Sequence, residues 1–235
     1  MPEQTSGQLP GAQTLSRGLR ALELLAEHSP LSIQELADHL GVHRSIAYRI
    51  VRTLEAHRLV VRDAGGRLEL GAQLAVLAQS VDRDLRAAAL PHLTTLATTT
   101  GCTAFVAVQD GDDVVTLVSV ESRSARASVA QRPGSRHPLA LGAPGIAIQT
   151  LLTTREWAAL GHDDAMRAEV AVAAERGYAT SSDEVVPGLS GVAAPIRHPL
   201  PPRAAVGVVT VGAADLDALG AASVDAARAI AADLA

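Results

Sequence analysis

Six arginines lie close together in a chain whose formal net charge is −5: Arg44, Arg49, Arg52, Arg58, Arg62 and Arg67. Only Glu55 and Asp63 offset them, so the segment from His43 to Arg67 carries a net charge of +4. Guanidinium groups form bidentate hydrogen bonds with phosphate oxygens and with the edge of guanine. A basic segment on an otherwise acidic chain therefore indicates one localised contact with a polyanion, and not a general affinity for nucleic acid or membranes.

The first half of this segment predicts a helix with two different faces. At roughly 100° per residue, one arc of about 140° collects the polar side chains Arg44, Ser45, Tyr48, Arg49 and Arg52. The opposite side collects the apolar side chains Ile46, Ala47, Ile50, Val51 and Leu54, and Arg58 falls beside it, outside the base-reading set. The apolar face would pack, whereas the polar face could contact base edges and phosphates in the major groove of DNA. The alternative is an ordinary solvated helix face.

The residues before this helix predict two more helices. The first is indicated by leucines that recur with a helical period: Leu15, Leu19, Leu22 and Leu25. It is expected to end near His28. Ser32 and Glu35 form a capping-box pattern at the start of the second helix, and Gly41 supplies the turn that ends it.

A β-hairpin is predicted after the third helix, with strands at residues 59–62 and 67–70 and a Gly-Gly pair in the turn between them. Arg62 and Arg67 on this hairpin would contact the DNA backbone or an adjacent minor groove. The order helix, helix, turn, helix, hairpin is that of a winged helix-turn-helix, which we expect over residues 15–70. Arg17 on the first helix completes the predicted set of DNA-contacting residues.

The remaining chain predicts a second domain of a different kind. Residues 71–84 are expected to form a linker helix. A second helix is expected after the linker helix, and Pro91 within it should bend or restart it. Strands are expected over 102–110, 114–122, 127–131, 192–196 and 205–213. Helices are expected within 138–153, over 164–176 and after Asp215. Residues 85–235 thus predict an α+β domain with one antiparallel sheet, and residues 1–14 a disordered arm.

The stretch TLSRGLRALELLAEHSPLSIQELADHLGVHRSIAYRIVRTLEAHRLVVRDAGGRLELGAQL resembles the DNA-binding domain of IclR-family bacterial transcriptional regulators. The resemblance continues in LRAAALPHLTTLATTTG, HPLALGAPGIA and ERGYATSSDEVVPGLSGVAAPI, and so covers nearly the whole chain after residue 14. It implies a winged-helix domain, a linker helix used in dimerisation, and a C-terminal GAF-like domain whose small-molecule effector shifts the affinity for DNA. The assembly it implies is a homodimer or a tetramer.

The resemblance also implies a set of effector-binding residues: Gly142, Ala143, Gly145, Ser181, Gly191, Val192, Val209 and Val211. Several of them depart from the family pattern. Gly191 stands where Cys is frequent and Ser181 where an acidic residue is frequent, and Pro144 has no N–H to offer an effector carboxylate. Since a polar pocket is penalised for unmatched hydrogen bonds, we hypothesise an effector that is more apolar or larger than a small oxo-acid.

No residue pattern predicts catalysis, a metal site or a cofactor. The stretch GLSG at residues 188–191 lacks the last glycine of a G-x-S-x-G elbow, so Ser190 is interpreted as a turn residue. His137 and His198 each stand beside a proline without metal-ligand spacing, and they are interpreted as solvated loop histidines. Cys102 is the only cysteine, which excludes an intramolecular disulfide and predicts a small buried apolar role.

Composition indicates a folded chain, with 48% apolar and 19% charged residues. The N-terminus lacks the basic and apolar regions of a signal peptide, and the uncharged residues 87–109 are interrupted by Pro91 and His92, which makes them a poor membrane span. The sequence therefore predicts a cytoplasmic transcriptional regulator, more often a repressor than an activator in this family. A ligand-independent regulator with a vestigial pocket is the alternative, and a hydrolase is a more distant one.

Overall fold

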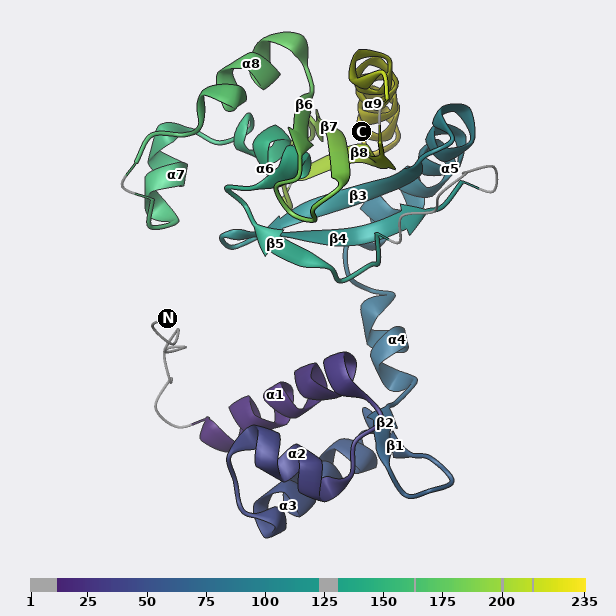
Figure 1. The fold of residues 1–235 in the computed structure, drawn as a ribbon, viewed down its shortest axis with the longest axis vertical. Helices are drawn as coiled ribbons and strands as arrows, with labels where there is room; N and C mark the ends of the chain where they lie inside the picture. The colour runs from purple at the N-terminus through teal and green to yellow at the C-terminus, as the bar shows by residue number, and fades with distance from the viewer. Residues whose placement is uncertain (1–11, 123–130, 163, 200, 213) are drawn as a thin grey trace. The chain divides into compact units, whose positions relative to one another are not determined.

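The computed structural model describes residues 12–122, 131–162, 164–199, 201–212 and 214–235. The chain divides into two compact units between Val81 and Asp82 (Figure 1). The predicted arm lies outside the described residues as far as residue 11, but Gln13 and Thr14 already belong to the first helix. Most of the strand predicted at residues 127–131 also lies outside the described residues.

The N-terminal unit has the predicted order of elements. It contains α1 (Gln13–His28), α2 (Ile33–Leu40), α3 (Arg44–Ala56), β1 (Val60–Arg62), β2 (Leu68–Leu70) and α4 (Gln73–Ala78). The capping box at the start of α2 is confirmed, because Ser32 Oγ accepts from the Glu35 amide while Glu35 accepts from the Ser32 amide. Gly41 ends α2 with a φ of 62°, a conformation that favours glycine. The strands β1 and β2 are antiparallel and cover the ends of the helices.

The buried face of α1 differs from the predicted one. Leu15 and Leu19 are 65% and 54% exposed, whereas the helix buries Gly18, Ala21, Leu24 and Leu25. Gly18 faces α3, since a Cβ placed on it would lie 4.0 Å from Cγ2 of Ile50, an ordinary van der Waals distance. Leu25 of the predicted period is in the core and Leu22 packs against it, so the leucine period identified the helix and part of its buried face.

The described residues of the C-terminal unit form a six-stranded antiparallel sheet in the order β5-β4-β3-β8-β7-β6. Its strands are β3 (Thr103–Asp110), β4 (Asp113–Val120), β5 (Arg136–Pro138), β6 (Ala179–Ser182), β7 (Leu189–Ile196) and β8 (Ala204–Val211). Its helices are α5 (Arg83–Thr100), α6 (Gly142–Gln149), α7 (Thr154–Ala159), α8 (Ala168–Arg176) and α9 (Leu216–Asp233). The α+β class is confirmed.

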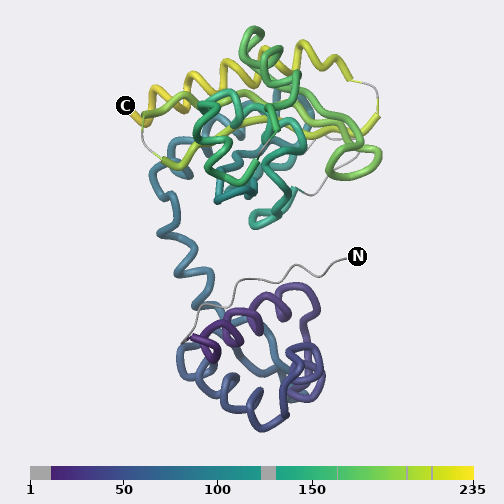
Figure 2. The backbone as a smooth tube through the Cα atoms, turned by 90° about the vertical axis from the view of Figure 1, so that its left-hand side faces the viewer, coloured from purple at the N-terminus to yellow at the C-terminus, as the bar shows by residue number. Residues whose placement is uncertain are grey.

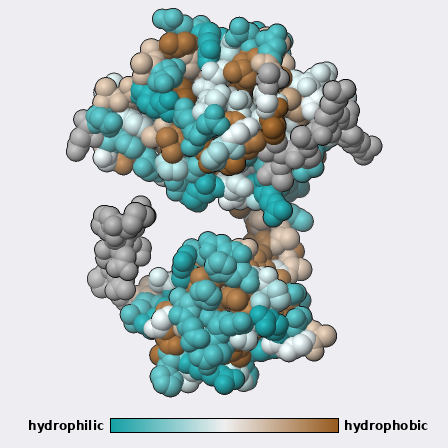
Figure 3. All heavy atoms as spheres, in the orientation of Figure 1, coloured by the Kyte–Doolittle hydropathy of each residue, from teal (hydrophilic) through white to brown (hydrophobic). Residues whose placement is uncertain are grey.

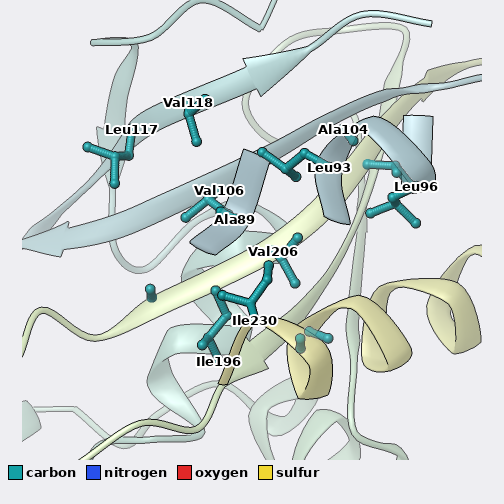
Figure 4. Close-up of a cluster of buried hydrophobic side chains, with 14 of the residues drawn as sticks. Ala89, Leu93, Leu96, Ala104, Val106, Leu117, Val118, Ile196, Val206 and Ile230 are labelled. Carbon is teal, nitrogen blue, oxygen red and sulfur yellow. The ribbon is translucent and has the colours of Figure 1, made fainter. Parts of the chain in front are cut away.

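Two helical layers cover the two faces of this sheet (Figures 1 and 2). The helices α5 and α9 pack beside each other on one face, where Leu93, Val106, Val206 and Ile230 share a core (Figure 4). On the other face, α6, α7 and α8 pack over alternate residues of the same strands, including Ala107 and Ala205. This alternation follows from the two-residue period of a strand.

Further differences from the predictions concern α5 and the short elements of the C-terminal unit. The helix α5 runs through Pro91 without a break, because apolar residues on both sides of the proline, including Ala89 and Leu93, pack against the sheet. Gly177 ends α8 as predicted, with a φ of 87°. The short strands β5 and β6 were not predicted, since their formation depends on neighbouring strands. The helix α7 was also not predicted, although the Thr153–Glu156 capping box at its start is a local signal that the sequence contains.

Candidate DNA-binding surface and effector pocket

The two predicted faces of α3 are confirmed. The helix buries Ala47, Ile50, Val51 and Leu54, and it exposes the predicted polar set of Arg44, Ser45, Tyr48, Arg49 and Arg52. The buried side chains join the core of the N-terminal unit together with α1 and the hairpin. The fold therefore holds the polar face outward on a helix whose opposite side is fixed.

The start of α3 forms an open hollow on this surface. It is lined by His43, Arg44, Ser45, Tyr48 and Arg49. His43 was not predicted as a site residue, although its place directly before the arginine-bearing helix could have suggested it. Further along the helix, a hydrogen bond with the Tyr48 side chain raises the pKa of Arg52, which remains charged. The hollow thus combines cationic, hydroxyl and imidazole groups in one exposed area.

The hairpin arginines have partners within the N-terminal unit. Arg62 Nε lies 2.7 Å from Glu55 Oε1, and its Nη1 donates to the Gly66 carbonyl at 3.1 Å. Arg67 Nη2 donates to the Pro30 carbonyl at 2.8 Å and to Glu35 Oε2 at 3.0 Å. These side chains tie the hairpin to the helices, and their predicted contact with DNA stays a prediction.

Arg58 and Arg17 lie away from the exposed face of α3. The helical projection does not apply to Arg58, since α3 ends at Ala56 and Arg58 follows with a φ of 58° in an exposed turn. Arg17 is half-buried on α1, next to Gly18, whose contact with Ile50 brings α1 against α3.

The C-terminal unit contains a pocket at the beginning of α6. Five of the predicted effector residues line it: Gly142, Ala143, Ser181, Gly191 and Val209. The rest of its lining comes from β3, β5, the segment before β7 and the first residue of β7, together with Gln131 and Pro144. These residues are Phe105, Gln131, His137, Pro144, Glu184, Val185, Val186 and Leu189. Chain segments far apart in the sequence therefore meet at one site.

The other three predicted effector residues lie outside this pocket. Val192 is fully buried on the opposite face of the sheet, because strand residues alternate and its neighbour Gly191 takes the pocket side. Val211 is at the end of β8 and is 49% exposed. At Gly145 a Cβ would lie 2.4 Å from the Leu139 carbonyl oxygen, so this glycine allows α6 to pack closely against the chain before it.

The backbone amides at the beginning of α6 already donate hydrogen bonds to side chains. The Gly142 amide donates to Glu184 Oε2 at 2.9 Å, and the Ala143 amide donates to Ser181 Oγ at 2.8 Å. Arg167 forms a bidentate interaction with the Glu184 carboxylate, with distances of 2.7 Å from Nη1 to Oε2 and 3.0 Å from Nη2 to Oε1. The hydrogen bonds from Arg167 lower the pKa of Glu184, which stays ionised at neutral pH. Glu184 and Arg167 carry no motif that sequence reasoning could have used.

The histidine and serine interpretations need correction. His137 belongs to β5 and lines the pocket, where burial lowers its pKa, so it is not a solvated loop residue. Ser190 belongs to β7, and its hydroxyl lies 2.9 Å from that of Ser182 on β6, so it is not a turn residue. Cys102 is half-buried, with Sγ 3.5 Å from the Thr100 carbonyl oxygen. His198 Nε2 lies 3.2 Å from the Leu234 carbonyl oxygen at the end of α9.

Among the described residues, no group of three or more His, Cys, Asp or Glu side chains is arranged to hold a metal ion. Within the same ranges, no helix is both long enough and apolar enough to cross a membrane.

Two family models match the chain. The IclR helix-turn-helix domain matches residues 14–64, and the bacterial transcriptional regulator IclR C-terminal domain matches residues 78–233. The chain belongs to the IclR family of transcriptional regulators. The first IclR match contains α3 and its exposed arginines, and the second contains every residue of the pocket.

Curated IclR-type regulators align over most of the chain. The regulator XynR from Escherichia coli (strain K12) is 29% identical over 206 residues, which cover 80% of this chain and 81% of that protein. The glycerol operon regulatory protein from Streptomyces griseus is 31% identical over 215 residues, covering 85% and 84%. Relatives of this chain are therefore regulators of transcription.

Solved IclR structures share the fold. The regulator from Alicyclobacillus acidocaldarius superposes with a TM-score of 0.80 at 25% identity, over 97% of this chain and 100% of that one. An IclR homologue from Microbacterium hydrocarbonoxydans, complexed with 4-hydroxybenzoate, gives a TM-score of 0.81 at 22% identity over 94% and 98%.

Proposed function

We propose that this IclR-family protein is a repressor that binds operator DNA through α3 and whose affinity for that DNA is changed by a small molecule in the pocket at α6. The observation that carries the proposal is the exposed polar face of α3 on a fixed winged-helix core. Chromosomal DNA as the target places the protein in the cytoplasm. A regulatory role also agrees with the relatives, and we propose no enzymatic activity.

The exposed face of α3 supports the DNA-binding step. Within the described part of the chain, the side chains of Arg44 and Arg49 form no ion pair or hydrogen bond, so their donors are available to phosphates and guanine edges. Ser45 and Tyr48 add hydroxyl groups that can donate to phosphate oxygens. A guanidinium group without a competing carboxylate partner binds the DNA without first breaking an internal ion pair.

An effector role for the pocket is supported by its lining. Apolar side chains such as Phe105, Leu189 and Val209 surround a few polar groups, which is the usual composition of a small-molecule site. This composition agrees with an effector that is more apolar than a small oxo-acid. Coupling between such a site and DNA affinity requires about 1–3 kcal/mol.

Two copies of the chain would bind a pseudo-palindromic operator. No residue of α4, which the structure describes in full, is buried, and Val76, Leu77 and Val81 are each more than half exposed. Figure 3 shows this helix as a mainly tan and brown segment. Contiguous exposed apolar residues mark interaction sites, so we place part of the dimer contact on α4, with Leu15 and Leu19 of α1 as further exposed apolar residues.

The test is selection of DNA fragments of the parent genome that the full-length protein retains. We expect these fragments to share a two-fold motif. We also expect the protein to release them when a compound that stabilises it against heating is added. Retained fragments without a common motif would contradict operator recognition. If the fragments share a motif but no stabilising compound releases them from the protein, the result would instead favour the regulator with a vestigial pocket.

A further inference from the structure

The beginning of α6 has no amide left for a ligand. In its first turn, the amide of Gly142 is bound by Glu184, the amide of Ala143 is bound by Ser181, and Pro144 has no N–H. A helix N-terminus ordinarily attracts anions through such free amides. Here the chain itself supplies the anion, which is the carboxylate of Glu184.

The guanidinium group of Arg167, which contacts Glu184, already has carboxylate partners. Both Nη atoms of Arg167 bond to Glu184, and Nη2 lies 3.0 Å from Glu169 Oε1 as well. One guanidinium group therefore faces two carboxylates. A carboxylate ligand that entered the pocket would meet the charge of Glu184, and no arginine is among the described residues that line the pocket. Juxtaposed like charges are strongly unfavourable.

Two polar side chains of the pocket, His137 and Gln131, offer acceptor atoms to a hydrogen-bond donor. His137 Nδ1 lies 3.1 Å from the Pro138 carbonyl oxygen, which can only accept, so Nδ1 carries the proton. Because burial lowers the pKa of His137, the ring is neutral at neutral pH and Nε2 can only accept. Gln131 donates one amide hydrogen to Thr116 Oγ1 at 2.9 Å, which leaves Oε1 to accept.

We propose that the pocket binds an uncharged molecule that has an apolar body and a hydroxyl or amide N–H group, and that Glu184 makes the pocket reject carboxylates. Phe105, Val185, Val186 and Val209 would contact the apolar body. The donor group would meet the acceptor atoms of His137 and Gln131. This assignment rests on the proposed function of the pocket as an effector site.

The first experiment compares two probes of equal shape on the full-length protein by calorimetry. 4-Hydroxybenzamide is uncharged, and 4-hydroxybenzoate is the acid that the Microbacterium homologue holds. We expect the amide to bind the wild type about tenfold or more tightly than the acid. Glu184→Gln should bring the two affinities within about threefold of each other, whereas Glu175→Gln, at an exposed position of the same unit, should leave the ratio unchanged.

Three results would overturn the inference: equal binding of acid and amide by the wild type, an unchanged ratio in Glu184→Gln, or no binding of either probe. The DNA selection described above does not depend on these probes. A clear operator motif with any of these three results would leave the DNA-binding function standing and remove only the assigned ligand class.

A second experiment tests the position of the internal carboxylate without an effector. Glu184→Ala vacates the space beside Arg167 and the Gly142 amide, and free acetate can take it. The melting temperature of Glu184→Ala should rise with acetate relative to equal concentrations of chloride, while that of the wild type should not. An identical response of the two proteins to acetate would show that Glu184 does not occupy an anion position.

Discussion

The two functional regions of this protein use arginine in opposite ways. On α3, Arg44 and Arg49 extend into solvent and have no side-chain partner among the described residues. At the pocket, both Nη atoms of Arg167 donate to Glu184, and the side chains of Arg167 and Glu184 are 31% and 22% exposed. The difference indicates that the arginines of α3 can act on another molecule, whereas Arg167 acts on the chain itself. Arginine count alone would not have separated these roles.

The largest effect is expected where arginine faces outward. The double substitution of Arg44→Ala and Arg49→Ala should weaken binding to a selected operator by about 2 kcal/mol or more, because each contact with a base or phosphate contributes about 1–3 kcal/mol. Fluorescence anisotropy with a labelled operator measures this change. Far-ultraviolet circular dichroism should show unchanged folding, since both side chains are solvated.

The matched control for this double variant is Arg228→Ala, whose side chain is 77% exposed on α9 and forms an ion pair with Asp225. It should bind the operator as the wild type does. Equal loss of affinity in the control and in the double variant would mean that general charge, and not the face of α3, binds DNA.

The inward arginine should instead affect stability. Arg167→Ala leaves Glu184 half-buried without its partner and should lower the free energy of unfolding of the C-terminal unit by about 2 kcal/mol. Trp157 is the only tryptophan and is buried in that unit, so its fluorescence during urea unfolding reports the change. Arg155→Ala, at an exposed position of α7, should change the same quantity by less than about 0.5 kcal/mol. A similar loss of unfolding free energy in the two variants would mean that Arg167 stabilises the unit no more than an exposed arginine does.

The hairpin arginines lie between these two cases. Arg67→Ala removes an exposed ion pair with Glu35 and should lower the stability of the N-terminal unit only slightly, as measured by thermal unfolding monitored by circular dichroism. If Arg67 also contacts DNA, as predicted, operator affinity will fall in the same variant. If the affinity for operator DNA is unchanged, Arg67 serves only to hold the hairpin against the helices.

A smaller effect is expected from pH. Hydrogen bonds from Arg167 lower the folded-state pKa of Glu184 below its unfolded value. The stabilisation is therefore present above the unfolded pKa of about 4.3 and is lost as pH falls through the lower folded value. The melting temperature followed by Trp157 fluorescence should fall less between neutral and acidic pH in Glu184→Gln than in the wild type. Parallel curves for the two proteins would contradict this linkage.

The sequence predicted the DNA-binding region better than the pocket, for a physical reason. The faces of α3 follow from residue order within one helix, so the angular spacing of Arg44, Ala47 and Arg49 is sufficient to separate them. The capping box at Ser32 and the turn at Gly41 are equally local. Residues beyond the helix end, such as Arg58, could not be placed, because the projection assumes a helix that stops at Ala56.

The pocket depends on contacts between distant segments. Resemblance located Gly142, Ala143 and Ser181, but it could not show that Ser181 and Glu184 bind the amides of α6. It also assigned Val192 to the pocket, although the strand turns that side chain to the opposite face. Which side of a strand faces a cavity, and which arginine reaches which carboxylate, are set by packing that a linear pattern does not contain.

The most direct test of the account is the salt dependence of operator binding. The logarithm of the binding constant of the wild type should fall steeply and linearly with the logarithm of salt concentration, because each phosphate contact releases counterions. Removal of Arg44 and Arg49 together should make this slope shallower by about 1 to 2, as contacts are lost. A slope that is the same in the wild type and in the double variant would contradict the assignment of α3 as the DNA-binding surface.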